Sequence, residues 1–68
     1  MRNTKTEIID VVLKAETERA IFVDYDGDEQ WLPLSQIEFL DLNYRKGESM
    51  SIEVPNWLMV KKGWSESD

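Results

Sequence analysis

The chain has 68 residues, which suffices for one domain and not for two, and 8 basic against 14 acidic residues give it a net charge of −6. It contains no cysteine and no histidine. Disulfide bonds, thiolate zinc sites and histidine-activated nucleophiles are therefore excluded. An acidic surface repels phosphate backbones, so the composition favours simple solubility or a partner with a basic surface over nucleic acid.

The N-terminal residues are charged, and the apolar stretch that follows them, residues 8–13, is short and interrupted by Asp10. The sequence thus predicts no signal peptide and no membrane span, which makes the cytoplasm the expected location. We expect a single small domain over residues 1–68, with flexible ends at about residues 1–5 and 65–68.

Two β-branched segments predict the first two strands, at residues 7–15 and 19–25. Because side chains alternate along a strand, residues two apart share a face. The expected apolar face of the first strand consists of Ile9, Val11, Leu13 and Ala15. In the second strand, the expected faces are Ile21, Val23 and Tyr25 on one side and Ala20 and Phe22 on the other.

The pair Asp26-Gly27 predicts a tight hairpin, because a type I′ turn requires positive φ at both positions. Residues 29–32 return as the third strand. Pro33 lacks an N–H group, so we expect that strand to end, bend or lie at a sheet edge there.

The second half of the chain is less regular. Residues 35–38 fit either the start of a short helix or a strand, and we favour a strand or a single turn. Residues 43–48 predict a loop with a glycine turn, and residues 50–54 alternate as the last strand. Pro55 suits the first position of a short helix over 56–62 that ends at Gly63.

These elements predict a mainly β (or α+β) fold: a small antiparallel sheet, or a partly open barrel of SH3-like or OB-like size, with one short C-terminal helix. In the helix, adjacent residues lie about 100° apart, so one of Trp57 and Leu58 faces outward. Leu58 has no polar atom, and we expect it to pack on the sheet while Trp57 stays half-exposed.

The densest acidic cluster is the hairpin tip, which comprises Asp24, Asp26, Asp28 and Glu29. Alternate aspartates resemble half of a calcium loop, but a loop starting at Asp24 has neither glycine at its sixth position nor glutamate at its twelfth. We expect a solvated hairpin tip, no metal, no cofactor and no catalytic residue. Paired catalytic acids need one buried member, which a two-residue turn does not provide.

Among the apolar residues, Trp31 and Trp57 are the candidates for exposed binding anchors. Leu34 follows Pro33 where a loop residue is usually polar, so it either packs beneath the hairpin or faces a partner. The alternative for the aromatic residues is packing in the core and at the helix end, which is the commoner role of tryptophan in so small a domain.

Three segments together carry a resemblance: Trp31–Glu38, Ile52–Leu58 and Lys61–Gly63. They resemble a group of small domains encoded by bacteriophages and prophages, often near replication and recombination genes. Those domains have a lysine where this chain has Leu34, and they lack the apolar insert at residues 39–44. The resemblance implies a bacterial host cell as the setting and brings no catalytic residue with it.

We therefore expect a non-catalytic accessory or inhibitor module that docks its acidic hairpin and nearby apolar residues onto a basic nucleic-acid-processing or defence protein. The residues that would supply the charge are Asp24, Asp26, Asp28, Glu29, Glu38 and Asp41. The first alternative is a module that binds single-stranded nucleic acid by stacking bases on its aromatic side chains. The second is a structural domain that forms a homodimer through an open sheet edge.

Overall fold

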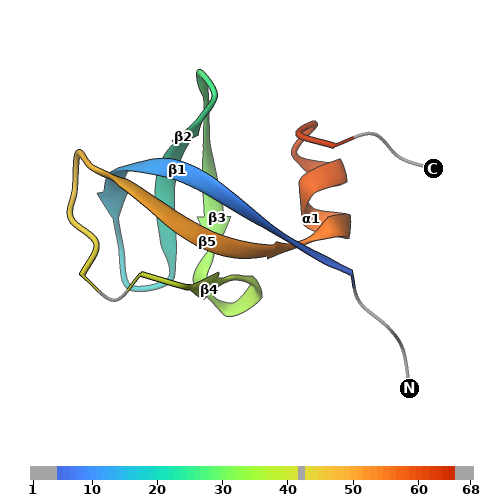
Figure 1. Cartoon of the computed structure of the whole chain (residues 1–68), viewed down its shortest axis with the longest axis horizontal. Coiled ribbons are helices and arrows are strands. Elements are labelled where there is room, and N and C mark those ends of the chain that lie inside the picture. Colours follow the sequence, from blue (N-terminus) through green and yellow to red (C-terminus); the bar gives the residue numbers. More distant parts are fainter. Residues whose placement is uncertain (1–4, 42, 66–68) are drawn as a thin grey trace.

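The computed structural model describes residues 5–41 and 43–65, and it shows one antiparallel sheet of five strands in the order β3-β2-β1-β5-β4 (Figure 1). The elements in chain order are β1 (Thr6–Glu16), β2 (Ala20–Tyr25), β3 (Asp28–Pro33), a 3-10 turn η1 (Leu34–Gln36), β4 (Glu38–Phe39), β5 (Ser49–Pro55) and α1 (Asn56–Lys61). The mainly β fold is confirmed: the sheet is open, with one short C-terminal helix. The terminal residues 1–4 and 66–68, for which we expect flexibility, lie outside the described residues.

The long strand β1 organises the sheet, because it pairs with β2 on one side and with β5 on the other. Its residues Ile9, Val11 and Leu13 are buried, as their alternation predicts. The prediction for Ala15 is wrong. A β-bulge between Leu13 and Ala15 inserts one extra residue, so Ala15 pairs with Phe22 on the outer side of the sheet.

The β2–β3 hairpin forms at the predicted turn. Asp26 has φ of 54° and Gly27 has φ of 92°, which are the two positive values that a type I′ turn needs. The Gly27 N–H donates a 2.7 Å hydrogen bond to Oδ1 of Asp24, which fixes the turn further. β3 is an edge strand and ends at Pro33, in agreement with the missing N–H group of that residue.

The segment after the hairpin combines both predicted forms, because the single turn η1 is followed by the two-residue strand β4. β4 pairs with β5 and forms the other edge of the sheet. Residues 43–48 form the predicted loop, and within it Gly47 has φ of 89°. The loop is held to the sheet by a 2.6 Å hydrogen bond from the Gly47 N–H to the carbonyl of Leu13.

The core lies on the inner face of the curved sheet and contains only apolar side chains among the described residues. Helix α1 follows β5 directly and lies at one end of the sheet (Figure 1), where it adds two of its residues to this core. The buried residues are Ile9, Val11, Leu13, Ile21, Val23, Leu32, Ile37, Met50, Ile52, Val54, Leu58 and Met59. Each strand therefore presents an apolar inner face and leaves its other face to solvent.

Helix α1 begins at Asn56, and Pro55 is extended and serves as its N-cap, not as the first helical residue for which the sequence favours it. Its C-terminus has the predicted Schellman geometry. The Gly63 N–H bonds to the carbonyl of Val60 at 3.0 Å, and the Trp64 N–H bonds to that of Met59 at 2.8 Å. Trp64 packs against the core, as expected for the apolar contact of this motif.

Side chains connect the end of α1 to the β2–β3 hairpin. The indole ring of Trp64 lies 4.8 Å from the ring of Tyr25, measured between centroids, and its N–H donates a 2.6 Å hydrogen bond to Asp28. Gln30 donates a 2.8 Å hydrogen bond to the carbonyl of Lys62. An isolated helix of six residues is not stable in water, so these contacts are what hold α1 in its helical form and in its place.

Candidate functional site

Two of the acidic residues at the hairpin, Asp24 and Asp28, accept hydrogen bonds, whereas Asp26 is exposed. Asp24 accepts the Gly27 N–H within the turn, and Asp28 accepts hydrogen bonds from Gln30 at 2.9 Å and from Trp64 at 2.6 Å. The side-chain hydrogen bonds from Gln30 and Trp64 hold the pKa of Asp28 below its ordinary value of 3.8, because they favour the charged carboxylate. Asp26 stays exposed at the turn. Asp24 and Asp28 thus stabilise the hairpin in addition to giving it charge.

Glu29 lies on the outer face of β3, and its carboxylate is 3.8 Å from the ammonium group of Lys14. Lys14 is the extra residue of the β1 bulge, so the bulge directs this cation toward the hairpin. Both side chains are more than 40% exposed, so the pair contributes little to stability, about 0–1 kcal/mol. Its consequence is electrostatic, because the carboxylate of Glu29 offsets the positive charge of Lys14.

Trp31 and Phe22 form an aromatic pair on the outer face of the sheet. They are direct cross-strand partners on β3 and β2, and their ring centroids are 5.0 Å apart with an interplanar angle of 40°. Such tilted pairs are favourable because ring edges and faces carry opposite partial charge. Trp31 nevertheless remains 45% exposed, whereas its chain neighbour Leu32 is fully buried. The pair therefore presents a flat apolar surface to solvent.

Charged residues border this aromatic pair. Asp24 and Glu29 are the next cross-strand partners on the same face, toward the turn, and Lys14 reaches Glu29 from β1. We call the five residues the aromatic patch: Lys14, Phe22, Asp24, Glu29 and Trp31. It unites three of the predicted site residues, namely Asp24, Glu29 and Trp31.

The remaining predicted residues lie elsewhere. Leu34 is partly buried and packs against the core, which agrees with the first of its two predicted roles, packing and not contact with a partner. Trp57 is 47% exposed and lies on helix α1, not on the strands that carry the aromatic patch. Its neighbour Leu58 is buried. The expected division between these two helix residues is confirmed.

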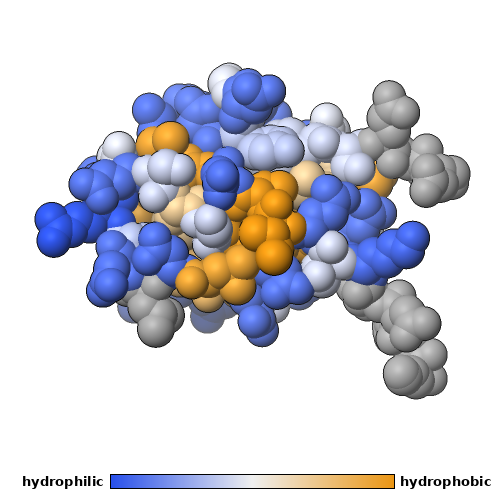
Figure 2. Space-filling view, viewed as in Figure 1, coloured by the Kyte–Doolittle hydropathy of each residue, from blue (hydrophilic) through white to orange (hydrophobic). Residues whose placement is uncertain are grey.

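Additional apolar surface is found on β1 and next to β4. Ile8 of β1 is 65% exposed and Leu40, which follows β4, is 46% exposed. Figure 2 shows hydrophobic surface in the middle of the molecule, over the region where β1 and β5 cross, and near β4, surrounded by hydrophilic side chains. Exposed apolar residues thus lie among hydrophilic side chains on this face of the molecule as well.

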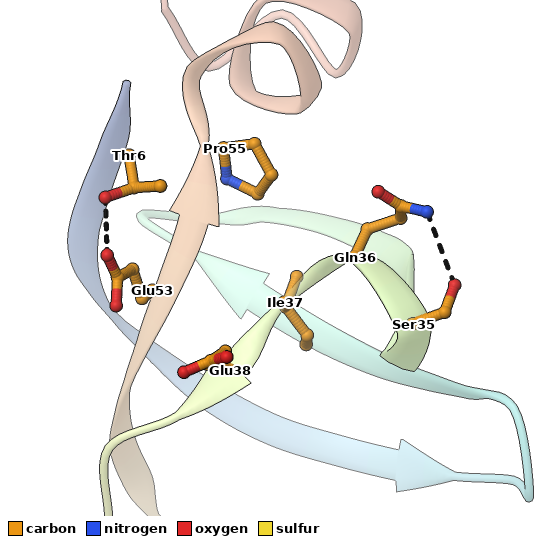
Figure 3. A pocket seen from close by; sticks show the side chains of 7 residues that line it. All are labelled: Thr6, Ser35, Gln36, Ile37, Glu38, Glu53 and Pro55. Carbon is orange, nitrogen blue, oxygen red and sulfur yellow. Dashed lines mark hydrogen bonds between the residues drawn. The ribbon is translucent and has the colours of Figure 1, made fainter. Parts of the chain in front are cut away.

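A hollow of about 410 Å³ opens between η1 and the end of β5, where it is lined by Thr6, Ser35, Gln36, Ile37, Glu38, Glu53 and Pro55. In Figure 3, Thr6, Glu53 and Glu38 lie on one side of the hollow, Gln36 and Ser35 lie on the other, and Pro55 and Ile37 lie between them. The Thr6 hydroxyl donates a hydrogen bond to Glu53 (Figure 3). Glu38 and Glu53 are direct cross-strand partners.

Sequence reasoning missed Phe22 as the partner of Trp31, and it missed the hollow. Alternation in twos does place Phe22 and Glu53 on outward faces, but it does not say which residue of another strand lies opposite. That depends on register, which the turn sets for β2–β3 and which long-range pairing sets for β1–β5. Thr6 precedes the segment that the sequence predicts as a strand, so no local signal identified it.

Two classes of site find no support within residues 5–41 and 43–65. No group of three or more carboxylate, histidine or cysteine side chains is arranged to hold a metal ion there. No described helix is long and apolar enough to cross a membrane.

Comparison with known proteins gives no relative. No family model, no curated protein and no solved structure matches this chain. The resemblance to phage-encoded domains stays a prediction.

Proposed function

We propose that the chain is a non-catalytic protein-binding module that docks through the aromatic patch. The observation that carries this proposal is the exposure of Trp31 while it is stacked on Phe22. Tryptophan is the residue type most enriched among those that dominate binding energy, and the best positions are central and surrounded by polar residues. Stacking on Phe22 orders the indole ring before binding, so less conformational entropy is lost when a partner covers it.

Charge specifies the kind of partner. Within the patch, Asp24 and Glu29 border the two aromatic rings and Lys14 is paired with Glu29, and the whole chain carries a charge of −6. A partner with an apolar pocket and a basic rim would complement this surface and associate quickly with it. Surfaces of that charge are typical of proteins that handle nucleic acids, and the expected setting is the cytoplasm of a bacterial host cell.

Affinity capture with paired variants tests the proposal. The tagged chain, its Trp31→Ser variant and its Trp57→Ser variant would be incubated with a lysate of the cell that expresses the protein, and retained proteins would be identified by mass spectrometry. We expect a defined protein to be retained by the wild type and by Trp57→Ser and lost with Trp31→Ser. If the wild type and both variants retain the same proteins equally, or if the wild type retains no protein, docking through the patch is contradicted. Circular dichroism checks that each variant is folded.

The exposed aromatic pair also suits stacking of single-stranded bases, which is the second candidate function. The cation Lys14 is paired with Glu29, so its charge is already offset. We therefore expect no quenching of tryptophan fluorescence when a mixed-sequence oligonucleotide is added at low salt. Quenching that disappears in Trp31→Ser and at high salt would favour nucleic-acid binding over the protein-binding function.

A further inference from the structure

We propose that the hollow between η1 and β5 is a socket for the guanidinium group of an arginine side chain that a protein partner presents. The inference rests on the proposed protein-binding function for the source of the arginine. It concerns a second position on the molecule, beside β5 and β4, which lie at the opposite edge of the sheet from β3. Four features carry it: the opposed carboxylates, the missing counter-charge, the mixed walls and the shape of the group that fits.

The first feature is the direct opposition of Glu38 and Glu53 across β4 and β5. Side chains at such positions have Cβ atoms about 4.5–5.5 Å apart, and like charges placed there repel each other. The Thr6 hydroxyl donates to Glu53 but brings no positive charge. One cation between the two carboxylates would convert this repulsion into two favourable contacts.

The second feature is that neither glutamate takes part in a salt bridge within residues 5–41 and 43–65. The one ion pair in those ranges joins Lys14 to Glu29, which lie on the bulge of β1 and on β3. The hollow is lined by neutral residues apart from its two glutamates. A cation from another molecule could therefore complement both carboxylates.

The third feature is the composition of the walls. Ile37 and Pro55 lie between the acidic side and the amide side of the hollow (Figure 3), so the hollow combines an apolar wall with the two carboxylates. Gln36 adds a carbonyl oxygen that can accept a hydrogen bond. An arginine side chain matches this combination, because its apolar stem carries a charged head.

The fourth feature is geometric. A guanidinium group is planar and has five N–H donors in a fixed fork, so one group can bind two neighbouring carboxylates at the same time. An ammonium group is a compact, strongly hydrated point charge and gains less from this arrangement. A bare metal ion is a poor match, since the hollow offers two carboxylates and the described residues contain no group of three potential metal ligands.

An NMR titration of the full chain tests the socket without any partner. Amide resonances of the ¹⁵N-labelled protein would be followed while N-acetyl-arginine methylamide is added, with the lysine and citrulline analogues as separate arms. We expect saturable shifts at the residues that line the hollow with arginine, weaker shifts with lysine and none with citrulline. Glu38→Gln and Glu53→Gln should each weaken arginine binding about tenfold, as for loss of a charge-assisted hydrogen bond. Glu18→Gln, an exposed acid at the other end of β1, is the matched control and should bind as the wild type does.

The outcomes separate this proposal from the proposed function. Shifts spread over the whole acidic surface, or wild-type affinity in Glu53→Gln, would overturn the socket. Equal affinity for lysine and arginine would overturn the guanidinium assignment. Protein capture that depends on Trp31 while arginine fails to bind leaves the proposed function intact and rejects the socket. Arginine binding at the hollow, with no captured protein, supports the socket and rejects the protein-binding function.

Discussion

At the scale of single residues, the turn at Gly27 gives the clearest prediction. Its φ of 92° is strained for a β-branched side chain, although an added Cβ would meet nothing within 4 Å. We expect Gly27→Val to lower the free energy of unfolding by about 1–3 kcal/mol through backbone strain alone. Gly27→Asn should cost less, because asparagine tolerates the left-handed region. Equal thermal melts for the wild type and Gly27→Val would show that the turn does not require this conformation.

Asp28 gives a prediction about pH. Its pKa is lowered in the folded state by hydrogen bonds from Gln30 and Trp64, so the unfolded chain takes up a proton at higher pH than the folded chain does. The contribution of Asp28 to stability is therefore complete well above pH 3.8 and decreases as the pH falls from about 5 through the folded-state pKa.

The measurement compares the melting temperatures of the wild type and Asp28→Asn between pH 7 and pH 3. We expect the wild type to be more stable at neutral pH, and the difference between the two proteins to shrink as the pH falls. Other carboxylates titrate in both proteins and cancel in this difference. A difference that stays constant with pH would mean that the charge of Asp28 does not stabilise its contacts.

At the scale of elements, helix α1 has one face in the core and one face in solvent. Leu58 is buried beside Met59, and Trp57 is 47% exposed on the adjacent position. We expect Leu58→Ala to lower the free energy of unfolding by about 2–5 kcal/mol, because it leaves a cavity in a small core. Trp57→Ala should cost less. Paired urea denaturation of the two variants measures the order, and a larger loss for Trp57→Ala would contradict it.

The elements also differ in how they are held. β2 and β3 form a hairpin whose turn is encoded locally, whereas α1 is short and depends on Trp64 and Gln30 to bind it to that hairpin. The hairpin therefore supports two surfaces at once: the helix end on its inner side and the aromatic patch on its outer side. This arrangement makes the position of Trp31 independent of flexible loops, which favours a pre-ordered binding surface.

At the scale of the whole molecule, the net charge of −6 controls association. Binding of the captured partner should weaken as salt rises from about 0.05 M to 0.5 M, because salt screens attraction between exposed charges. Affinity measured by isothermal titration calorimetry at several salt concentrations checks this. An affinity that does not change with salt would mean that the apolar residues of the patch act without help from its carboxylates.

The same charge bears on self-association. β3 and β4 are open edges, and the homodimer that the sequence left as an alternative would pair one of them with its copy. Repulsion between two chains of charge −6 opposes that pairing, and Pro33 cannot donate a hydrogen bond at the end of β3. Under the proposed function these edges stay unpaired between copies, and light scattering after size-exclusion chromatography would give the mass of a monomer.

Local chemistry determined much of this protein. Positive φ at Asp26-Gly27, alternation in β1 and β5, the missing N–H of Pro33 and the Schellman ending at Gly63 each follow from a few neighbouring residues, and each was predictable from the sequence. The tertiary structure decided what depends on register. The bulge at Lys14 turned Ala15 outward, and long-range strand pairing brought Glu38 opposite Glu53. The position of Trp31 opposite Phe22, in contrast, follows from the two-residue turn at Asp26-Gly27, which sets the register of the hairpin. No tight turn joins Glu38 to Glu53, so the free energy that selects their pairing comes from burial of the common core, which no single segment reveals.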